Sequence, residues 1–218
     1  MARTIVIGDI HGCYDELARL LEKLRLESGD RVVSVGDLTV KGPKSRAVLD
    51  LFVQDSRFSS VVGNHDLALV RHWQGKKPSL TNAQEKTFLE LQTDDDRYLR
   101  YLSTLPFFIE LDSHVVVHAG LRPGISLEKQ SAEDLVELRT LGEDRTSREG
   151  TPWYEVYEGP AIALFGHWPS PEPRLGNYAI GLDTGCVYGG QLTAYTIEIR
   201  EFSSEPATRA YDSSRAIP

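Results

Sequence analysis

The stretch Thr4-Ile5-Val6-Ile7-Gly8-Asp9-Ile10-His11-Gly12 joins a short apolar run directly to an acidic residue and a histidine. Two later stretches repeat the arrangement: an apolar run at 32–35 precedes Gly36-Asp37, and Val61-Val62 precedes Gly63-Asn64-His65-Asp66. Short runs rich in Val and Ile, bounded by glycine, predict buried strands. Residues that follow the carboxyl ends of parallel strands meet in one crevice. The sequence therefore predicts that these polar residues lie close together.

Helical patterns separate these strands in the first half of the chain. Leu17, Leu20, Leu21 and Leu24 recur at the spacing of one helix face. Alternation of strands and helices predicts parallel pairing with right-handed crossovers. The expected strands are 4–7, 31–35 and 59–62, and the expected helices are 14–24, 45–53, 66–73 and an amphipathic stretch at 81–105.

The pattern changes after Pro106. Short connections there predict antiparallel or mixed pairing, and hence a second sheet packed on the first. The expected strands are 107–111, 115–119, 161–165, 178–182 and 191–199, with a short helix at 132–138. The length of 218 residues suits one sizeable domain. We assign it to 1–202 and expect 203–218, which is rich in Ser, Pro, Arg and Ala and lacks periodicity, to be a loose tail.

Composition narrows the class of protein. The formal net charge of −8 argues against a general nucleic-acid or membrane surface, but permits a small anionic phosphate substrate held by metals and local cations. The longest apolar runs are too short to span a bilayer, and no secretory leader is recognisable. Cys13 and Cys186 are the only cysteines and form no disulfide framework. We therefore expect a cytoplasmic protein with reduced thiols and no membrane association.

His118, in His118-Ala119-Gly120-Leu121, and His167, in Gly166-His167, enlarge the polar set that follows the strands. Taken singly, each such block is a common turn; their order and their position after apolar runs favour one metal centre. A shell of His, Asp and Asn suits manganese, iron, zinc or nickel better than calcium or magnesium. Two ions roughly 3.5–4 Å apart form a clamp for displacement at phosphorus.

The five blocks together resemble a known family. GDIHG at 8–12, GDLTVKGPKS at 36–45, GNHD at 63–66, HAGL at 118–121 and GHW at 166–168 resemble the calcineurin-like metallophosphoesterases, and more narrowly the phosphoprotein phosphatase superfamily. The resemblance implies an α/β fold, a four-layer α/β/β/α sandwich of two mixed sheets with a dinuclear metal centre between them. It implies one metal held by Asp9, His11 and Asp37, and a second held by Asp37, Asn64, His118 and His167. It also makes His65 the general acid.

The chain departs from the protein phosphatases of this superfamily at 36–42. Those enzymes carry Gly-Asp-x-Val-Asp-Arg-Gly, and here Val40 replaces the second Asp and Lys41 replaces the Arg. Lysine binds phosphate as a point charge, without the bidentate fork of arginine. The missing Asp orients the catalytic histidine in those enzymes, so another group must orient His65; Asp66 is a candidate by proximity in sequence.

Other stretches are similar to the ApaH-like phosphatases, which are relatives of the bacterial symmetrical diadenosine tetraphosphatases. They are KGPKS at 41–45, EGTPW at 149–153, GP at 159–160, FGH at 165–167 and AIGLDTGCVYGGQLTA at 179–194. Arg139 lies where that group has a phosphate-facing arginine. Asp183 is expected to anchor its loop or a ligand histidine, and Cys186 to be a small buried residue. Trp153 and Tyr154 are candidates either for stacking on a base or for loop packing.

The resemblance implies a phosphohydrolase with two divalent ions, manganese first, with iron, zinc, nickel or cobalt as alternatives. A metal-bridging hydroxide would attack phosphorus, Lys41 and Arg139 would neutralise the phosphate, and His65 would protonate the leaving group. The implied substrate is a dinucleoside polyphosphate such as diadenosine tetraphosphate, or a nucleotide-capped RNA 5′ end. Two alternatives stay open: a serine/threonine phosphatase acting on a phosphoprotein, and a non-enzymatic binding scaffold. The sequence predicts neither the oligomeric state nor the bond cleaved.

Overall fold

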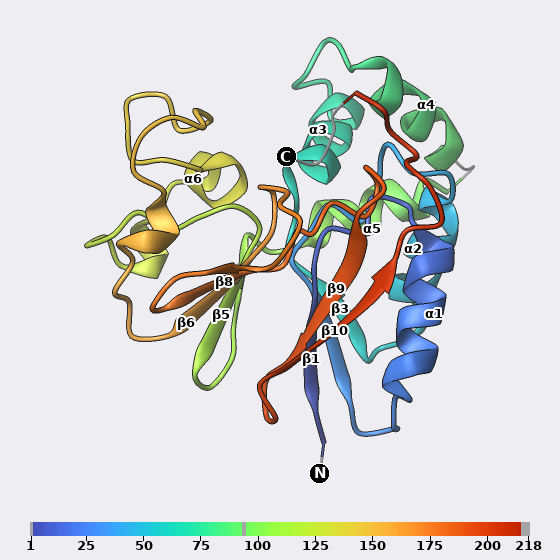
Figure 1. Cartoon of the computed structure of the whole chain (residues 1–218). Coiled ribbons are helices and arrows are strands. Elements are labelled where there is room, and N and C mark those ends of the chain that lie inside the picture. Colours follow the sequence, from blue (N-terminus) through green and yellow to red (C-terminus); the bar gives the residue numbers. More distant parts are fainter. Residues whose placement is uncertain (1, 93–94, 215–218) are drawn as a thin grey trace.

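A computed structural model describes residues 2–92 and 95–214 of the chain (Figure 1). Its first sheet has the strand order β10-β9-β1-β2-β3. The strands β1 (Thr4–Ile7), β2 (Arg31–Ser34) and β3 (Phe58–Ser60) are parallel, with Ile5 opposite Val32 and Val33 opposite Ser59. The predicted parallel pairing is therefore confirmed.

The helices of the first half follow the predicted apolar faces. They are α1 (Tyr14–Leu24), α2 (Ser45–Gln54), α3 (Asn64–Trp73), α4 (Asn82–Leu91) and α5 (Arg97–Thr104). The helical stretch expected at 81–105 is thus two helices, and residues 93–94 between them lie outside the described part of the chain. Helix α4 begins at a capping box, in which Thr81 and Gln84 satisfy each other's backbone amides.

The second sheet is mixed, as predicted, with the order β4-β5-β6-β8-β7. The strands β5 (His114–Val117), β6 (Ile162–Phe165) and β8 (Ala179–Gly181) are parallel, while β4 (Phe108–Glu110) and β7 (Arg174–Leu175) flank them in antiparallel pairs. Short helices lie between these strands: η1 (Leu127–Lys129), α6 (Ala132–Glu137) and η2 (Trp153–Glu155).

Alternating side chains build the four layers. On β1, Ile5 and Ile7 pack with Leu17 and Leu20 of α1, whereas Val6 faces the second sheet. That inner core joins Val6, Val33, Val35 and Val61 to Val116, Leu164 and Leu182. On the far face of the second sheet, Val115, Val117 and Phe165 pack with Leu135 and Trp153. Figure 1 shows α1 and α2 outside the first sheet and α6 beside the second, which is the expected α/β/β/α order.

The end of the chain corrects one expectation. Strand β9 (Gln191–Thr196) joins the first sheet antiparallel to β1, and β10 (Glu201–Pro206) pairs with β9. Residues 203–206, expected to begin a loose tail, are therefore strand, because the edge of β9 supplies backbone partners for them. Residues 207–214 continue over the loop after β8, where Tyr211 N donates to Val187 O. Residues 215–218 lie outside the described ranges.

None of the helices in the described part of the chain is long and apolar enough to cross a membrane.

Candidate active site

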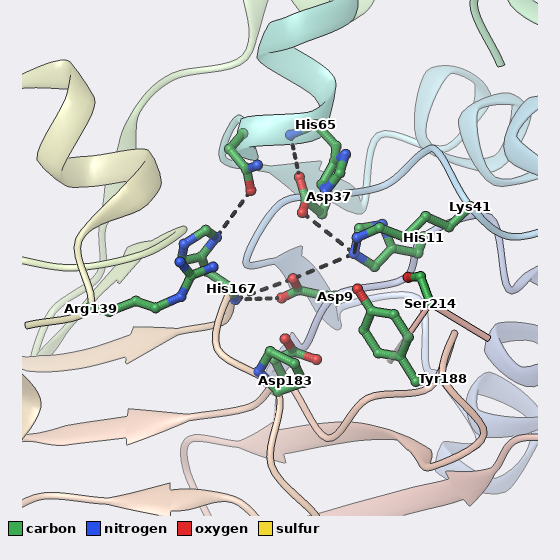
Figure 2. Close-up of a pocket in the computed structure, with 12 residues that line it drawn as sticks. Asp9, His11, Asp37, Lys41, His65, Arg139, His167, Asp183, Tyr188 and Ser214 are labelled. Carbon is green, nitrogen blue, oxygen red and sulfur yellow. Dashed lines mark hydrogen bonds and ion pairs between the residues drawn. The ribbon is translucent and has the colours of Figure 1, made fainter. Parts of the chain in front are cut away.

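A cavity of about 210 Å³ opens where the loops after several strands converge (Figure 2). Asp9 follows β1, Asp37 follows β2, and His167 follows β6. Asn64 and His65 begin α3, and Arg139 enters from the segment after α6. Residues distant in sequence thus reach one place because the parallel strands of both sheets end there.

Two glycines permit close approach of the carboxylates. A Cβ atom on Gly63 would overlap Oδ1 of Asp37, and one on Gly166 would overlap Oδ1 of Asp9. His11, Asp37 and His167 themselves have positive φ angles of 48°, 47° and 67°. Left-handed backbone at residues other than glycine is strained and clusters at functional sites. The backbone is therefore shaped to bring these side chains together.

The structure brings the predicted metal ligands together around Asp37. Oδ2 of Asp37 lies 3.5 Å from Nε2 of His11 and 3.6 Å from Nε2 of His118. Nε2 of His11 is also 4.0 Å from Oδ2 of Asp9. Asp37 therefore lies between two groups of donors, as a bridging ligand would. Ligand atoms of Asp9, Asp37 and His118 form one set within 4.8 Å of one another, and those of His11, Asp37 and His65 form another.

Asn64 and His167 complete this arrangement. Oδ1 of Asn64 is 3.0 Å from Nε2 of His118 and 3.0 Å from Nδ1 of His167. The backbone N–H of His167 donates to both oxygens of Asp9, at 3.1 and 3.2 Å. Nε2 of His167 is buried and has no hydrogen-bond partner in the described part of the chain. Such an atom is unusual in a folded protein and is suited to ligating a cation.

Backbone carbonyls fix two of the imidazoles. Nδ1 of His11 lies 3.0 Å from the carbonyl of Thr39, and Nδ1 of His118 lies 2.9 Å from that of Val35. A carbonyl can only accept, so Nδ1 carries the proton in both rings. This leaves Nε2 as a lone-pair donor facing the cavity, which is the usual second contact of a metal-ligating histidine.

Burial sets the charge state of the cluster. It raises the pKa of Asp9 well above its usual range, with neighbouring carboxylates adding to the shift, and raises the pKa of Asp37 to about 6. Burial also lowers the pKa of His118 to about 4 and the pKa values of His11 and His167 well below the usual range. Neutral imidazoles are the donor state that divalent cations need, and bound cations would supply the positive charge that keeps buried carboxylates ionised. The residues present therefore fit a metal centre.

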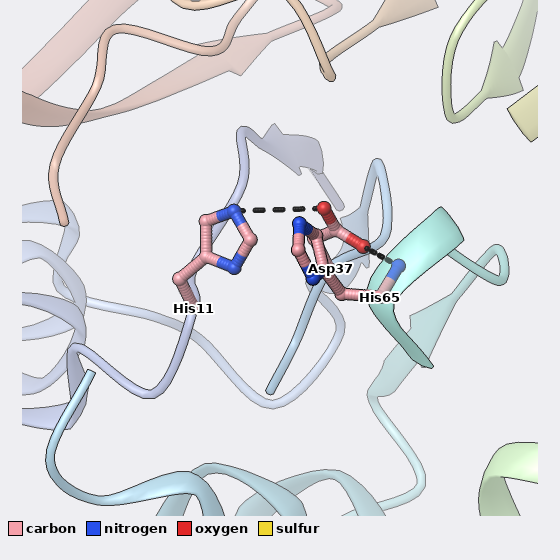
Figure 3. A group of neighbouring side chains, drawn as sticks. All are labelled: His11, Asp37 and His65. Atoms are coloured by element: carbon pink, nitrogen blue, oxygen red, sulfur yellow. Dashed lines mark hydrogen bonds and ion pairs between the residues drawn. The ribbon is translucent and has the colours of Figure 1, made fainter. Parts of the chain in front are cut away.

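His65 lies beside this centre (Figure 3). Its backbone N–H donates to Oδ1 of Asp37 at 2.9 Å, and its ring meets that of His11 edge-on at 5.2 Å. Nδ1 of His65 lies 3.4 Å from Nε2 of Gln84. The sequence offered Asp66 as the orienting group, but the Asp66 carboxylate accepts from Leu38 N and from Thr39 N and Oγ1 and so secures that loop.

Gln84 has a fixed amide orientation. Its Oε1 accepts from Thr81 N at 3.0 Å in the capping box, which turns Nε2 toward His65. Val40, by contrast, is fully buried in the core of the first sheet and has a φ of 71°. A carboxylate at position 40 would be buried among apolar side chains here, so this chain positions its histidine from α4.

The two predicted phosphate-binding cations line the cavity from opposite sides in Figure 2. Nζ of Lys41 lies 3.3 Å from Nε2 of His11 and 5.3 Å from the ring centroid of Tyr188. The Arg139 side chain is held by a hydrogen bond of 2.9 Å from Nη1 to the carbonyl of Thr146. A phosphate in the cavity would thus meet positive charge at two edges.

The sequence missed other cavity residues. The cavity is also lined by Tyr188, Pro169 and Ser214. Of these, only Tyr188 lies in a stretch that the sequence singles out, the Gly-rich stretch at 179–194. Asp183, the expected anchor of its loop or of a ligand histidine, also lines the cavity and accepts from Gly185 N at 3.0 Å. Trp153 and Tyr154, the candidates for base stacking, are buried in the core of the second sheet. That stacking hypothesis is wrong because both rings pack against Phe165.

The sequence profile of the calcineurin-like phosphoesterases matches residues 2–191. The chain is 32% identical to the bis(5′-nucleosyl)-tetraphosphatase PrpE [asymmetrical] of Anoxybacillus flavithermus, and 33% identical to that of Bacillus subtilis, with 98% of both chains covered in each case. Both names carry the word asymmetrical, whereas stretches of this sequence such as 179–194 resemble relatives of the symmetrical diadenosine tetraphosphatases.

Solved structures agree on the fold. One of a protein described as a candidate diadenosine tetraphosphatase has a TM-score of 0.82 and 33% identity, covering 94% of both chains. A protein serine/threonine phosphatase of Saccharomyces cerevisiae has a TM-score of 0.66 at 14% identity and covers 95% of this chain and 81% of its own. The second likeness concerns the fold alone.

Proposed function

This chain belongs to the calcineurin-like phosphoesterase family, and on that premise we propose that it hydrolyses bis(5′-nucleosyl) tetraphosphates asymmetrically. The family makes it a metal-dependent hydrolase with two divalent ions. The substrate and the unequal cleavage rest on the names of the relatives, which match the chain over nearly its whole length. The net charge of −8 disfavours a large polyanion, while Lys41 and Arg139 at the cavity suit a small polyphosphate.

The structural observation that carries this proposal is the position of the Asp37 carboxylate between Nε2 of His11 and Nε2 of His118. We assign one metal to Asp9, His11 and Asp37, and the other to Asp37, Asn64, His118 and His167. The mixed nitrogen and oxygen donors favour manganese, with iron, zinc, nickel or cobalt as alternatives. When bound, the two ions supply Lewis-acid polarisation of the phosphate and a water of lowered pKa.

The protein's own residues perform the other tasks. Lys41 and Arg139 bind the equatorial phosphate oxygens and neutralise the negative charge that grows on them. His65 gives its proton to the oxygen that leaves phosphorus, and Gln84 holds the ring through Nδ1. The position of His65 relative to the metal ligands is fixed because its backbone N–H donates a hydrogen bond to Asp37. We also propose a reducing, cytoplasmic location, which the two free cysteines support.

A substrate panel tests the proposal. Purified protein with Mn²⁺ is offered diadenosine tetraphosphate, a nucleotide-capped RNA, a phosphopeptide and nitrophenyl phosphate at equal concentration. We expect the highest kcat/KM for diadenosine tetraphosphate, with ATP and AMP as products. Two ADP molecules would show symmetrical cleavage. Preference for the phosphopeptide would make the protein a serine/threonine phosphatase, and metal binding without any hydrolysis would make it a scaffold.

A further inference from the structure

A second group of potential ligands lies outside the residues that line the cavity. It consists of Cys13, Glu16 and Cys186, which offer one ligand atom each within 4.8 Å of one another. Their relative exposures are 1%, 0% and 1%. Cys13 directly precedes α1, Glu16 lies in its first turn, and Cys186 belongs to the loop after β8. The fold therefore buries two thiols and a carboxylate together.

The two oxygens of Glu16 have very different surroundings. Oε1 accepts from Thr208 N at 3.0 Å, Thr208 Oγ1 at 2.9 Å, Tyr211 OH at 2.9 Å and Arg19 Nη2 at 3.3 Å. Oε2 is buried and has no hydrogen-bond partner within residues 2–92 and 95–214. A buried carboxylate oxygen without a donor is unfavourable, so Oε2 is suited to ligating a cation.

We propose that Cys13, Cys186 and Glu16 bind a thiophilic divalent cation of the zinc class, separate from the catalytic pair. Thiolate and carboxylate ligands are both common for zinc, and thiolates select against manganese and magnesium. Zinc–sulfur bonds of about 2.3 Å and zinc–oxygen bonds of about 2.0–2.2 Å put ligand atoms of a tetrahedral shell roughly 3.5–3.8 Å apart. A contraction of at most about 1.3 Å closes the present group to that spacing.

Such an ion would connect three segments that border the cavity. Cys13 follows His11 by two residues, and Cys186 precedes Tyr188 by two. Glu16 accepts hydrogen bonds from Thr208 and Tyr211, which belong to the segment after β10. The same segment brings Ser214 to the cavity. The ion would therefore act as a structural clamp and raise the melting temperature.

The test uses protein whose catalytic site has first been filled with Mn²⁺, and then adds Cd²⁺ under reducing conditions. Near-ultraviolet absorption reports thiolate-to-metal charge transfer, which the catalytic ligands cannot produce because they include no cysteine. We expect one additional equivalent of Cd²⁺ with this band in the wild type. Cys13→Ala and Cys186→Ala should lose the band, and Glu16→Gln should bind Cd²⁺ at least about tenfold more weakly.

A matched control separates ligand loss from disturbance of the fold. Thr208→Ala removes the Oγ1 donor to Oε1 but leaves the backbone N–H donor, Oε2 and both thiols, so it should keep the band. Circular dichroism and Mn²⁺ content verify folding of each variant. No charge-transfer band in the wild type would overturn the proposal, as would a band that survives both cysteine substitutions. A disulfide between Cys13 and Cys186 in the untreated protein would also overturn it.

Discussion

The backbone amide of His65 donates a hydrogen bond of 2.9 Å to Oδ1 of Asp37, whose other oxygen faces His11 and His118. The Asp37 carboxylate is thus the proposed metal bridge and also positions the proposed acid, His65. Any movement of Asp37 would displace His65 with it. This coupling makes the consequences of single substitutions specific enough to test.

Asp37→Asn should lose at least one of two metal equivalents and nearly all activity. The amide keeps one oxygen, but its –NH₂ group cannot ligate a cation, so bridging is lost. Elemental analysis and turnover of diadenosine tetraphosphate measure the outcome. Two full equivalents of metal in this variant would rule out the bridging role.

His65→Ala should keep both metals and slow turnover by about 10²–10⁴-fold, the usual contribution of a positioned general acid. The loss should be largest for alkyl phosphates, whose alkoxides are poor leaving groups, and should shrink for nitrophenyl phosphate, because its leaving group scarcely needs a proton. Rates across phosphate esters whose leaving groups span several pKa units provide the measurement. An equal loss for all of them contradicts the assignment of His65 as the acid.

Gln84→Leu should show the same leaving-group dependence as His65→Ala, with a smaller loss of kcat. The reason is that Nε2 of Gln84 contacts Nδ1 of His65 at 3.4 Å and so orients the ring. Gln84 also belongs to the capping box of α4, which Thr81→Ala disrupts without touching that contact. We therefore expect Thr81→Ala to lower the melting temperature but leave kcat nearly unchanged. Equal kcat losses in both variants would reduce Gln84 to a structural role.

Lys41→Ala should lower kcat/KM by about 10–100-fold while metal content stays normal, because it removes one charge facing the phosphate. Lys41→Arg should recover part of the loss. Lys44→Ala is the matched control, since Lys44 is exposed and pairs with Asp15. Loss of metal from the Lys41 variant would instead mean that it supports His11, 3.3 Å away.

Asp30→Asn should destabilise the protein by about 1–3 kcal/mol at pH 7. The reason is that the Arg3 guanidinium and the backbone N–H groups of Arg3 and Glu27 donate to this carboxylate. The Arg3 guanidinium holds the pKa of Asp30 well below its usual range. A depressed folded-state pKa gives stability that is fully present above the unfolded value of about 3.9 and lost as the pH falls through the folded value. Urea unfolding of both proteins should therefore show a smaller difference at pH 3 than at pH 7.

Asp15→Asn controls for the loss of a surface charge. Asp15 pairs with Lys44 across exposed side chains, so its substitution should change the free energy of unfolding by less than about 0.5 kcal/mol. The linkage argument for Asp30 fails if its variant differs from the wild type by the same amount at both pH values.

Much of the fold follows from local patterns. The Val- and Ile-rich runs at 4–7 and 31–35 are strands because they are short, apolar and bounded by glycine or polar turns. Alternation with amphipathic helices such as 14–24 then fixes parallel pairing, since antiparallel neighbours need no crossover. Parallel strands end on one side, which is why Asp9, Asp37 and Asn64 could be placed together from sequence.

Other features depend on contacts between distant segments. The residue pattern at 191–196 predicts a strand, but it does not show that β9 pairs with β1 in the first sheet. Packing between distant segments selects the partner of a strand. Gln84 reaches His65 only because α4 packs beside α3 and the capping box turns its amide. Val40 stands where the protein phosphatases carry an Asp, but here its side chain packs in the hydrophobic core.

The sequence by itself determined the strand–helix order and the chemical identity of the metal-centre donors, because both depend on residue type and short-range spacing. Only the tertiary structure decided which neighbours surround them: Gln84 at His65, Tyr188 and Ser214 at the cavity, and Cys13 beside Glu16 and Cys186. Cys13 and Cys186, for example, lie 173 residues apart in the sequence. Contacts at that separation arise from the packing of whole layers, which no local period encodes.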